Sequence, residues 1–433
     1  MRRMGTWMLA LALPLAAQEI APPDENALFQ DTSQILDSLP RAPAPAARGE
    51  KTLGISGTLA AFGNGIADRE YFPGFDADRS RFSAGAIGDA ALDARLPRGF
   101  RAYAGFEWGL DAARSDSASF RVPETFLDAN IARRAWFRAG KQVLQWGPGW
   151  FFNPTDLINV ERKTLVQRIG SREGVFGAKA QVPFGTAANL YAFLDAEKAR
   201  RPDSLSGAVK AEFLLGRSEI AAMAWGGGGR DPVYGADLST RLFGLDVTAE
   251  AALHSVFTVR TLDLSGGLPA LETEERDWQP RASLGAGRAF GFSGIPERLR
   301  INAEYYYNHP GSRARRMPFA RFMGMLPAAG ITPEQAMAAA AAAGFYEPNS
   351  FSRNYAAVSA VWTRFIRSSL TLSGNAIANL DQASALLAGV LAYQDLQGFG
   401  LSAIVYGFAG PEGTEYTLAG EAIQLQLLAE IRF

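Results

Sequence analysis

The chain has 433 residues, of which 48% are apolar and 20% charged, so its composition excludes a disordered polypeptide. The formal net charge of −1 excludes a generally basic nucleic-acid binder, and the length allows two or three soluble domains or one large barrel. There is no cysteine and there are two histidines, which excludes disulfides and a His/Cys zinc site. We therefore expect no metal and no cofactor.

The N-terminus has the pattern of a secretory signal peptide. Arg2 and Arg3 precede an apolar run from Trp7 to Ala17 that ends in small residues. This run is shorter than the ~20 residues that a membrane-spanning helix needs. We expect a signal peptide over residues 1–17 and a periplasmic extension with a Pro/Ala-rich linker over residues 18–50. A small lumen insert or a partner-docking helix is the alternative for that extension.

From Lys51 onward the recurring signal is an alternation of apolar and polar residues, clearest in residues 81–96 and 100–111. These runs are about 10 to 13 residues long, whereas soluble strands usually have about five or six residues. A tilted strand that crosses a bilayer needs about 9 to 11 residues. The strand length therefore favours a membrane protein over the alternative, a large soluble β-sandwich or propeller.

The joints between the expected strands alternate in length. We expect about eighteen strands (range 16–18), with tight turns such as "LPRGF" and "LLGRSE" on one side and mostly longer joints, among them "GGGGRDPVYG", on the other. Outer-membrane barrels have this alternation of short periplasmic turns and longer outer loops. The sequence therefore predicts an all-β fold, a transmembrane antiparallel β-barrel over residues 51–433.

The stretch 138–163 has the most unusual composition. Arg138, Gly140 and Gln142 share one face of an expected strand, and the aromatic and turn residues that follow are Trp146, Trp150, Phe151, Phe152, Asn153 and Asp156. Aromatic residues near a strand end are also typical of the interfacial girdle of a barrel. The order Arg-x-Gly-Lys-Gln, Trp-Gly, Asn-Pro-x-Asp resembles that of large Gram-negative outer-membrane porin families. The resemblance implies that the loop after this strand turns inward and narrows the channel.

The longest expected loop, residues 310–352, contains a short helix. Thr332 is a candidate N-cap, Pro333 takes the first helical position, Gln335 completes a capping box, and Gly344 ends the helix. Before the helix lie Arg313, Arg315 and Arg316. This basic segment either is a solvated surface loop or folds towards the pore, where it would attract anions.

The last strand, residues 421–433, alternates apolar and polar residues and ends on Phe433. It resembles the C-terminal signature of outer-membrane β-barrels. The resemblance implies that the barrel assembly machinery recognises this strand and that it closes the barrel against the first one.

These observations predict a channel in the bacterial outer membrane for passive diffusion of small polar solutes. The residues expected to line the pore or its constriction are Arg138, Gln142, Glu124, Asp128, Arg101, Glu107 and Asp89. We expect Arg138 to pair with Asp128 or Glu124. Expected partners are outer-membrane lipid and lipopolysaccharide, the barrel assembly machinery and small solutes, but no nucleic acid; a homotrimer is an expectation by analogy.

Two other classes stay open. One is a substrate-binding transporter or exporter for a glycan or hydrophobic compound, with Trp146, Trp150, Phe151 and Phe152 lining its path. The other is a structural or adhesive surface barrel. We expect no enzyme, because the adjacent His254 and Ser255 would point to opposite faces of a strand.

Overall fold

The computed structural model describes residues 53–433 except residues 69–80, 97–98, 112–117, 132–133, 145, 157–173, 198, 200, 264–269, 319, 321–336, 338, 342, 345, 367–368, 395–396 and 419. The expected signal peptide (1–17) and N-terminal extension (18–50) lie outside the described residues.

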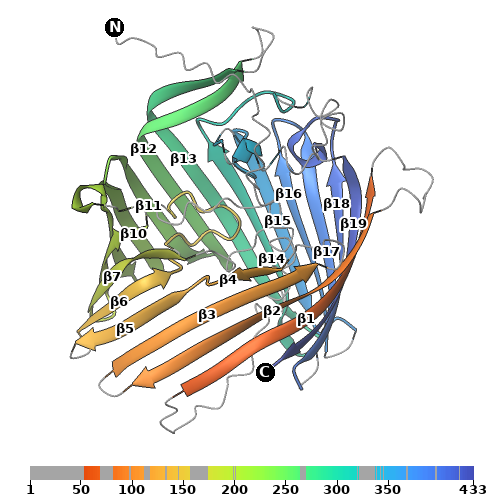
Figure 1. Cartoon of the computed structure of the whole chain (residues 1–433), viewed down its shortest axis with the longest axis horizontal. Coiled ribbons are helices and arrows are strands. Elements are labelled where there is room, and N and C mark those ends of the chain that lie inside the picture. Colours follow the sequence, from red (N-terminus) through yellow and green to blue (C-terminus); the bar gives the residue numbers. More distant parts are fainter. Residues whose placement is uncertain are drawn as a thin grey trace.

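The described chain is almost entirely antiparallel sheet (Figure 1). The strands are β1 Leu53–Asp68, β2 Arg81–Leu96, β3 Phe100–Asp111, β4 Ser119–Arg121, β5 Thr125–Ile131, β6 Ala135–Gln142, β7 Val175–Phe184, β8 Ala188–Asp195, β9 Ser206–Leu215, β10 Ser218–Gly227, β11 Arg230–Leu242, β12 Leu245–Asp263, β13 Ala270–Phe292, β14 Ile295–Asn308, β15 Asn354–Thr363, β16 Leu370–Asn379, β17 Ser384–Gln394, β18 Phe399–Ala409 and β19 Glu421–Arg432. Since β4 and β5 both pair with β3, they are two pieces of one strand. The described residues therefore form an 18-strand sheet, as the sequence predicts.

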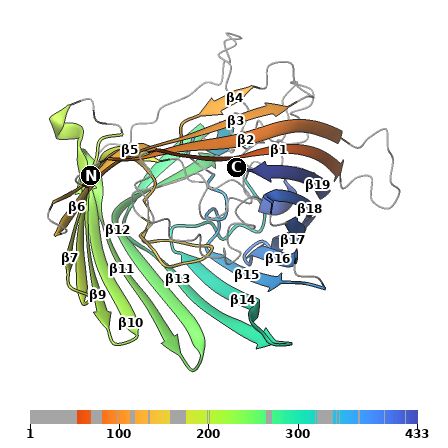
Figure 2. The same ribbon diagram turned by 90° about the horizontal axis from the view of Figure 1, so that it is seen from below.

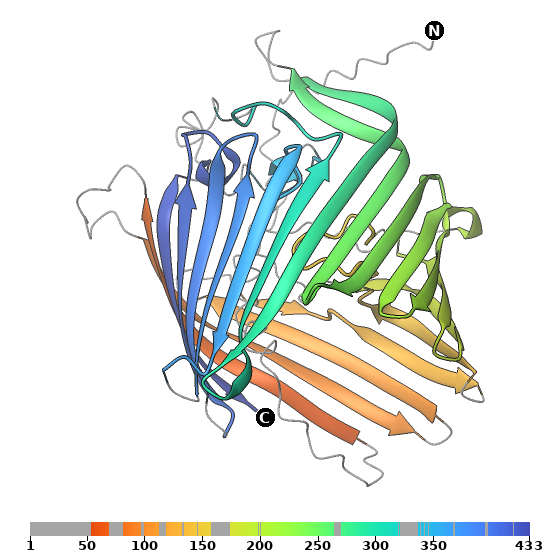
Figure 3. The same ribbon diagram turned by 180° about the vertical axis from the view of Figure 1, so that it is seen from behind.

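The sheet closes on itself through its first and last strands (Figure 3). β1 pairs with β19 over the register Thr58↔Arg432 to Asp68↔Glu421. The main chains of Gly57 and Phe433 exchange two hydrogen bonds of 3.0 Å beyond that register. Closure satisfies the backbone groups of both strands without water, which a sheet in hydrocarbon requires.

The alternation in sequence separates an apolar outer face from a mostly polar inner face. In β19, Leu425, Leu427 and Ile431 are 44–56% exposed on the outside, whereas Gln426 and Glu430 are buried inside. The outer face exposes large apolar side chains on almost every strand, including Leu59, Phe82, Leu110, Leu127, Leu190, Val209, Leu284 and Leu387. This pattern is typical of a barrel whose outside meets lipid and whose inside meets water.

Two adjacent positions in β2 test this assignment. Ala90 shares the outer face with Phe82 and Leu92, and Ala91 shares the inner face with Asp89 and Asp93. We expect Ala90→Arg to lower barrel stability by about 2–4 kcal/mol, the cost of an arginine near the bilayer midplane. Ala91→Arg should cost much less, because its side chain meets the lumen. Urea unfolding in lipid vesicles measures both, and equal costs would contradict the outward orientation of Ala90.

Two expectations about strand and loop length were wrong. β12 and β13 have 19 and 23 residues, and Val256–Asp263 pairs with Ala270–Asp277 beyond the register of both neighbouring strands. This part of the hairpin forms the two-stranded ribbon that projects above the barrel in Figure 1. In addition, the four-glycine joint is a two-residue turn, in which Gly228 and Gly229 have φ of +59° and +76°. Glycine adopts such angles without steric cost, so the run builds a tight turn rather than a long loop.

The expected short helix is present. Met337 and Ala339–Ala341 are helical, and Gly344, with φ of +73°, ends the helix and donates a hydrogen bond to the Ala341 carbonyl (2.9 Å). The expected N-cap residues Thr332, Pro333 and Gln335 lie outside the described residues. Across the part of the chain that the structure describes, no helix has the length and apolar character to cross a membrane.

Candidate functional site

The chain that follows β6, residues 143–156, runs inside the ring of strands (Figure 2). We call this stretch the inner segment; residue 145 within it is not described. It starts at the end of β6 and makes contacts as far as β14 and β15. Since β14 is the eighth strand round the ring from β6, the inner segment crosses most of the lumen.

The first attachment of the inner segment is largely apolar. Leu144 and Trp146 are buried in a cluster with inward-facing residues of β8 to β12, namely Phe193, Ala208, Ala221, Met223, Trp225, Val233 and Ala252. Lys210 of β9 donates from Nζ to the Trp146 carbonyl oxygen at 2.6 Å. The same Nζ lies 3.4 Å from Asp237 Oδ2, so the buried ammonium is compensated.

The second attachment is made by two carboxylates of the far wall. Glu250 of β12 accepts hydrogen bonds from the Gly149 N–H (2.6 Å), the Thr155 N–H (3.1 Å) and the Thr155 hydroxyl (2.6 Å). Glu304 of β14 accepts from three consecutive backbone N–H groups, those of Trp150, Phe151 (2.7 Å) and Phe152 (3.0 Å). A Cβ added at Gly149 would lie 2.7 Å from Glu250 Oε1, so only glycine brings the backbone this close.

The aromatic residues of the inner segment lie inside the barrel. Phe152 is 4% exposed and stacks on Tyr306 of β14 (ring centroids 4.9 Å apart, planes at 10°), and Tyr355 of β15 packs against it at 6.1 Å. Trp146 is 7% exposed, whereas Trp150 is 40% exposed. Trp146 and Phe152 therefore pack in the interior and do not belong to an interfacial girdle. Among the large aromatic rings of the inner segment, that of Trp150 is the most exposed.

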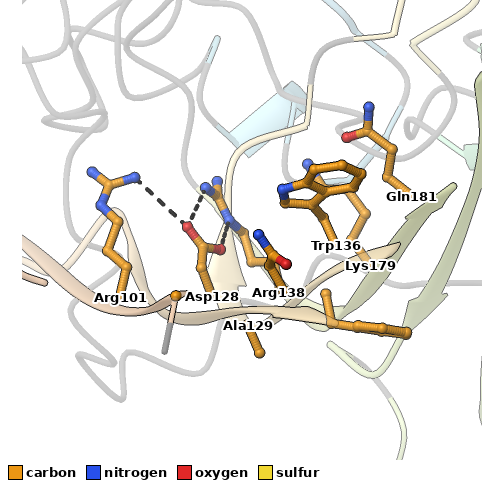
Figure 4. A pocket seen from close by; sticks show the side chains of 10 residues that line it. Arg101, Asp128, Ala129, Trp136, Arg138, Lys179 and Gln181 are labelled. Carbon is orange, nitrogen blue, oxygen red and sulfur yellow. Dashed lines mark hydrogen bonds and ion pairs between the residues drawn. The ribbon is translucent and has the colours of Figure 1, made fainter. Parts of the chain in front are cut away.

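Charged residues of β2 to β7 form a wall on the inner face of the barrel, and Figure 4 shows those of β3 to β7. Arg138 of β6 makes a two-bond contact with Asp128 of β5, with Nε–Oδ1 of 2.6 Å and Nη2–Oδ2 of 3.0 Å. Arg101 of β3 makes the same kind of contact with Asp93 of β2 (2.7 and 3.2 Å) and lies 3.6 Å from Asp128. The Arg138 guanidinium also lies 3.6 Å from the centre of the Phe126 ring. Paired contacts of this kind hold both guanidinium groups in fixed orientations.

The charged wall borders a cavity of about 290 Å³ that is also lined by Trp136, Lys179 and Gln181. Lys179 of β7 lies opposite Arg138 in the β6–β7 register. The wall thus presents three cations, Arg101, Arg138 and Lys179, against the carboxylates of Asp93 and Asp128. The wall therefore carries charges of both signs, with Arg101 and Arg138 paired to Asp93 and Asp128.

The remaining residues expected at the pore take different positions. Glu107 pairs with Arg121 (3.0 Å), and Asp89 lies opposite Glu107 in the β2–β3 register. Glu124 accepts a hydrogen bond from the Val143 N–H (2.8 Å), so it supports the start of the inner segment, and the carboxylate that pairs with Arg138 is that of Asp128. Gln142 corrects the expectation directly: it is fully buried and donates to the Gly177 carbonyl (3.2 Å), so it does not face the lumen water.

Asn153 and Asp156 form the turn that ends the inner segment, where the Asp156 N–H donates to the Asn153 carbonyl (3.1 Å). The next residues, 157–173, lie outside the described part of the chain. The contacts of Glu250 and Glu304 with the inner segment were not predicted from the sequence.

Loops on the long-loop side pack together over β14 to β18, and we call residues 309–318, 346–353, 380–383 and 410–418 the outer cover. Its centre is Glu415, which is 1% exposed and accepts hydrogen bonds from the Tyr355 hydroxyl (2.8 Å), the Asn379 amide (2.7 Å) and the Asn349 N–H (2.8 Å). Arg313, Arg315 and Arg316 are exposed on this cover and make no ion pair with the described residues. The structure therefore places the three arginines at the surface of a packed cover.

Burial raises the pKa of Glu415 to about 7, partly opposed by the hydrogen bonds from Tyr355, Asn379 and Asn349. Because the pKa in the packed cover exceeds the ordinary 4.5, packing favours the protonated acid. The resulting stability is fully present below pH 4.5 and is lost as pH rises towards 7.

We expect amide exchange in residues 410–418, corrected for its intrinsic pH dependence, to show less protection at pH 8 than at pH 5. Glu415→Gln, which stays neutral, should remove that difference; an unchanged pH dependence in this variant would assign the effect to another group.

No metal site is evident within the described ranges, where no group of three His, Cys, Asp or Glu side chains is arranged to hold an ion. No protein-family model matches the sequence. A search of curated proteins likewise finds no match.

Solved structures give a clear match in fold. The chain resembles Acinetobacter baumannii OccAB4, with a TM-score of 0.51 and 8% identity over 88% of this chain and 98% of that one. Pseudomonas aeruginosa OccK8 (OprE) gives 0.51 and 11%, and a BenF-like porin from Pseudomonas fluorescens Pf-5 gives 0.50 and 10%, both with the same coverage. The class that these comparisons define is the closed β-barrel of the porin type. At this level of identity the likeness concerns the fold alone.

Proposed function

We propose that this protein is an outer-membrane channel through which small polar solutes diffuse passively. The observation that carries the proposal is the closed 18-strand barrel, with an apolar outer face and a charged inner wall on β2 to β7. Barrels of this size enclose an aqueous lumen instead of a packed core. The likeness in fold to a BenF-like porin agrees with this proposal.

The solute path in this proposal lies between the charged wall and the inner segment. Arg101, Arg138 and Asp128 present fixed charges on the wall, and Trp150, which is 40% exposed, has the most exposed large ring of the inner segment. Charges of both signs along one wall favour polar solutes over apolar ones. We infer that Arg138 and Asp128 form part of the constriction and that the inner segment narrows the channel.

The same proposal covers location and partners. The exposed apolar side chains of the outer face suit outer-membrane lipid and lipopolysaccharide. The last strand, with Phe433 63% exposed at its end, is the element that we expect the barrel assembly machinery to recognise.

A transporter or exporter that moves its substrate along four aromatic rings has less support. Trp146 is 7% exposed and packs against β8 to β12, and Phe152 is 4% exposed and packs against Tyr306 and Tyr355, so they offer little surface to a passing ligand. Of the four expected rings, Trp150 is the most exposed. An open pore therefore fits the interior better than an aromatic slide.

Planar-bilayer recording of the purified protein tests the proposal. We expect stepwise openings on the order of a nanosiemens in molar salt, as for a water-filled pore. Heat-denatured protein is the control. A refolded barrel that inserts but stays silent would contradict the channel function and favour a structural or adhesive role.

A further inference from the structure

The inner segment is held in the lumen by side chains of β8 to β15. Its two attachments differ in kind, since Leu144 and Trp146 pack in an apolar cluster, whereas residues 149–155 are held mainly by hydrogen bonds to Glu250 and Glu304. Those two carboxylates together accept six hydrogen bonds, five of them from backbone N–H groups. Hydrogen bonds to a carboxylate are stronger than those to a neutral acceptor.

The hydrogen bonds at Glu304 require a side chain that only accepts, such as an ionised carboxylate. Three consecutive N–H groups, from Trp150 to Phe152, converge on its two oxygens. A run of N–H groups that point to one centre forms a site for negative charge. Each of these donors would lose its partner if the carboxylate were removed, and glutamine would turn an NH₂ group towards them.

The hydrogen bonds to Glu250 and Glu304 also fix which side chain of the inner segment is exposed. With the backbone of residues 150–152 held on Glu304, Phe152 is directed onto Tyr306 and Tyr355, and Trp150 is left 40% exposed. Glu250 fixes the other end of the same stretch at Gly149 and Thr155. The position of the Trp150 ring relative to the charged wall therefore depends on both carboxylates.

We propose that Glu250 and Glu304 are positioning residues that set the width of the pore by clamping residues 149–155 across the lumen. This inference rests on the proposed channel function. The carboxylates act through the inner segment and need not touch the solute. Their loss should leave the barrel closed, because the strand pairing of β12 and β14 is made by the main chain.

Amide hydrogen exchange on the full-length barrel tests the clamp without reference to conductance. In the double variant Glu250→Gln/Glu304→Gln we expect the amides of residues 149–152 and 155 to exchange at least about tenfold faster than in the wild type. Glu107→Gln is the matched control, since it also removes one lumen carboxylate, which pairs with Arg121 of β4. Unchanged exchange at these amides overturns the clamp. If the double variant does not insert, Glu304→Gln alone carries the same test.

Single-channel recording then tests the effect on the pore. We expect the double variant to conduct at least about twice as well as the wild type and to admit larger polyethylene glycols. In a channel whose residues 147–156 are replaced by about four glycine and serine residues, the two substitutions should have no further effect. An equal increase in that shortened channel would overturn the proposal, because the glutamates would then act without the segment. If the wild-type protein does not conduct but the double variant still exchanges faster at these amides, the channel function is refuted and the clamp stands.

Discussion

Replacing Arg138 by glutamate should shift the ion selectivity of the channel towards cations. The substitution removes a positive charge and adds a negative one beside Asp128, which lies 2.6 Å from the Arg138 Nε in the wild type. Arg101 and Lys179 are then left against Asp93, Asp128 and the new carboxylate. We expect the cation-to-anion permeability ratio to rise by about threefold or more, because the charge changes at the constriction that we propose for this pore.

Reversal potentials in a salt gradient measure this ratio. Arg217→Glu is the matched control, since Arg217 is exposed in the short turn between β9 and β10, away from the charged wall. The control should change selectivity little. Equal shifts in the two variants would mean that net charge alone sets the selectivity, and no shift in Arg138→Glu would remove Arg138 from the constriction.

Tyr355→Ala should be among the most destabilising single substitutions in the inner face of the barrel. The side chain is fully buried, its ring packs against Phe152 and Tyr306, and its hydroxyl donates to Glu415. Truncation of a buried aromatic residue usually costs about 3–5 kcal/mol. Tyr355→Phe keeps the ring and should cost about 1–3 kcal/mol, since it leaves the Ser352 N–H and Glu415 without one partner each.

Urea unfolding in detergent micelles gives both free energies of unfolding. Val358→Ala is the matched control, because Val358 lies on the same strand but is 46% exposed on the outer face. We expect it to cost less than either substitution at Tyr355. A Tyr355→Ala variant as stable as the control would contradict a stabilising role for the contacts of Tyr355 with Phe152 of the inner segment and Glu415 of the outer cover.

The barrel could be predicted from the sequence because its cause is local. Alternation within each strand decides which side chains face lipid, and the tight joints fix the register of neighbouring strands. The Asp128–Arg138 ion pair follows in this way, since β5 and β6 form a hairpin closed at Ile131 and Ala135. The ribbon of β12 and β13 was not predicted, because strand lengths were judged by what is needed to cross a bilayer and these two strands are longer.

The interior contacts could not be predicted, because they depend on how far the ring of strands curves. Thr155 and Glu250 are 95 residues apart in sequence, and Phe152 and Glu304 are 152 apart. Their meeting requires both the closed ring and the path of the inner segment through it. Gln142 was misplaced for the same reason: its parity points inward, but the interior at that position is filled by protein. The roles of these residues in permeation stay predictions.

The most direct test of the whole account is a cysteine scan along β3, which is feasible because the natural chain has no cysteine. Single cysteines at Arg101 and Glu107 would face the lumen, and those at Ala102 and Phe106 would face lipid. During single-channel recording, a charged, membrane-impermeant thiol reagent should reduce the current at the first pair and leave it unchanged at the second. Reaction at all four positions alike, or at Ala102 and Phe106 only, would contradict a sealed barrel with water inside and lipid outside.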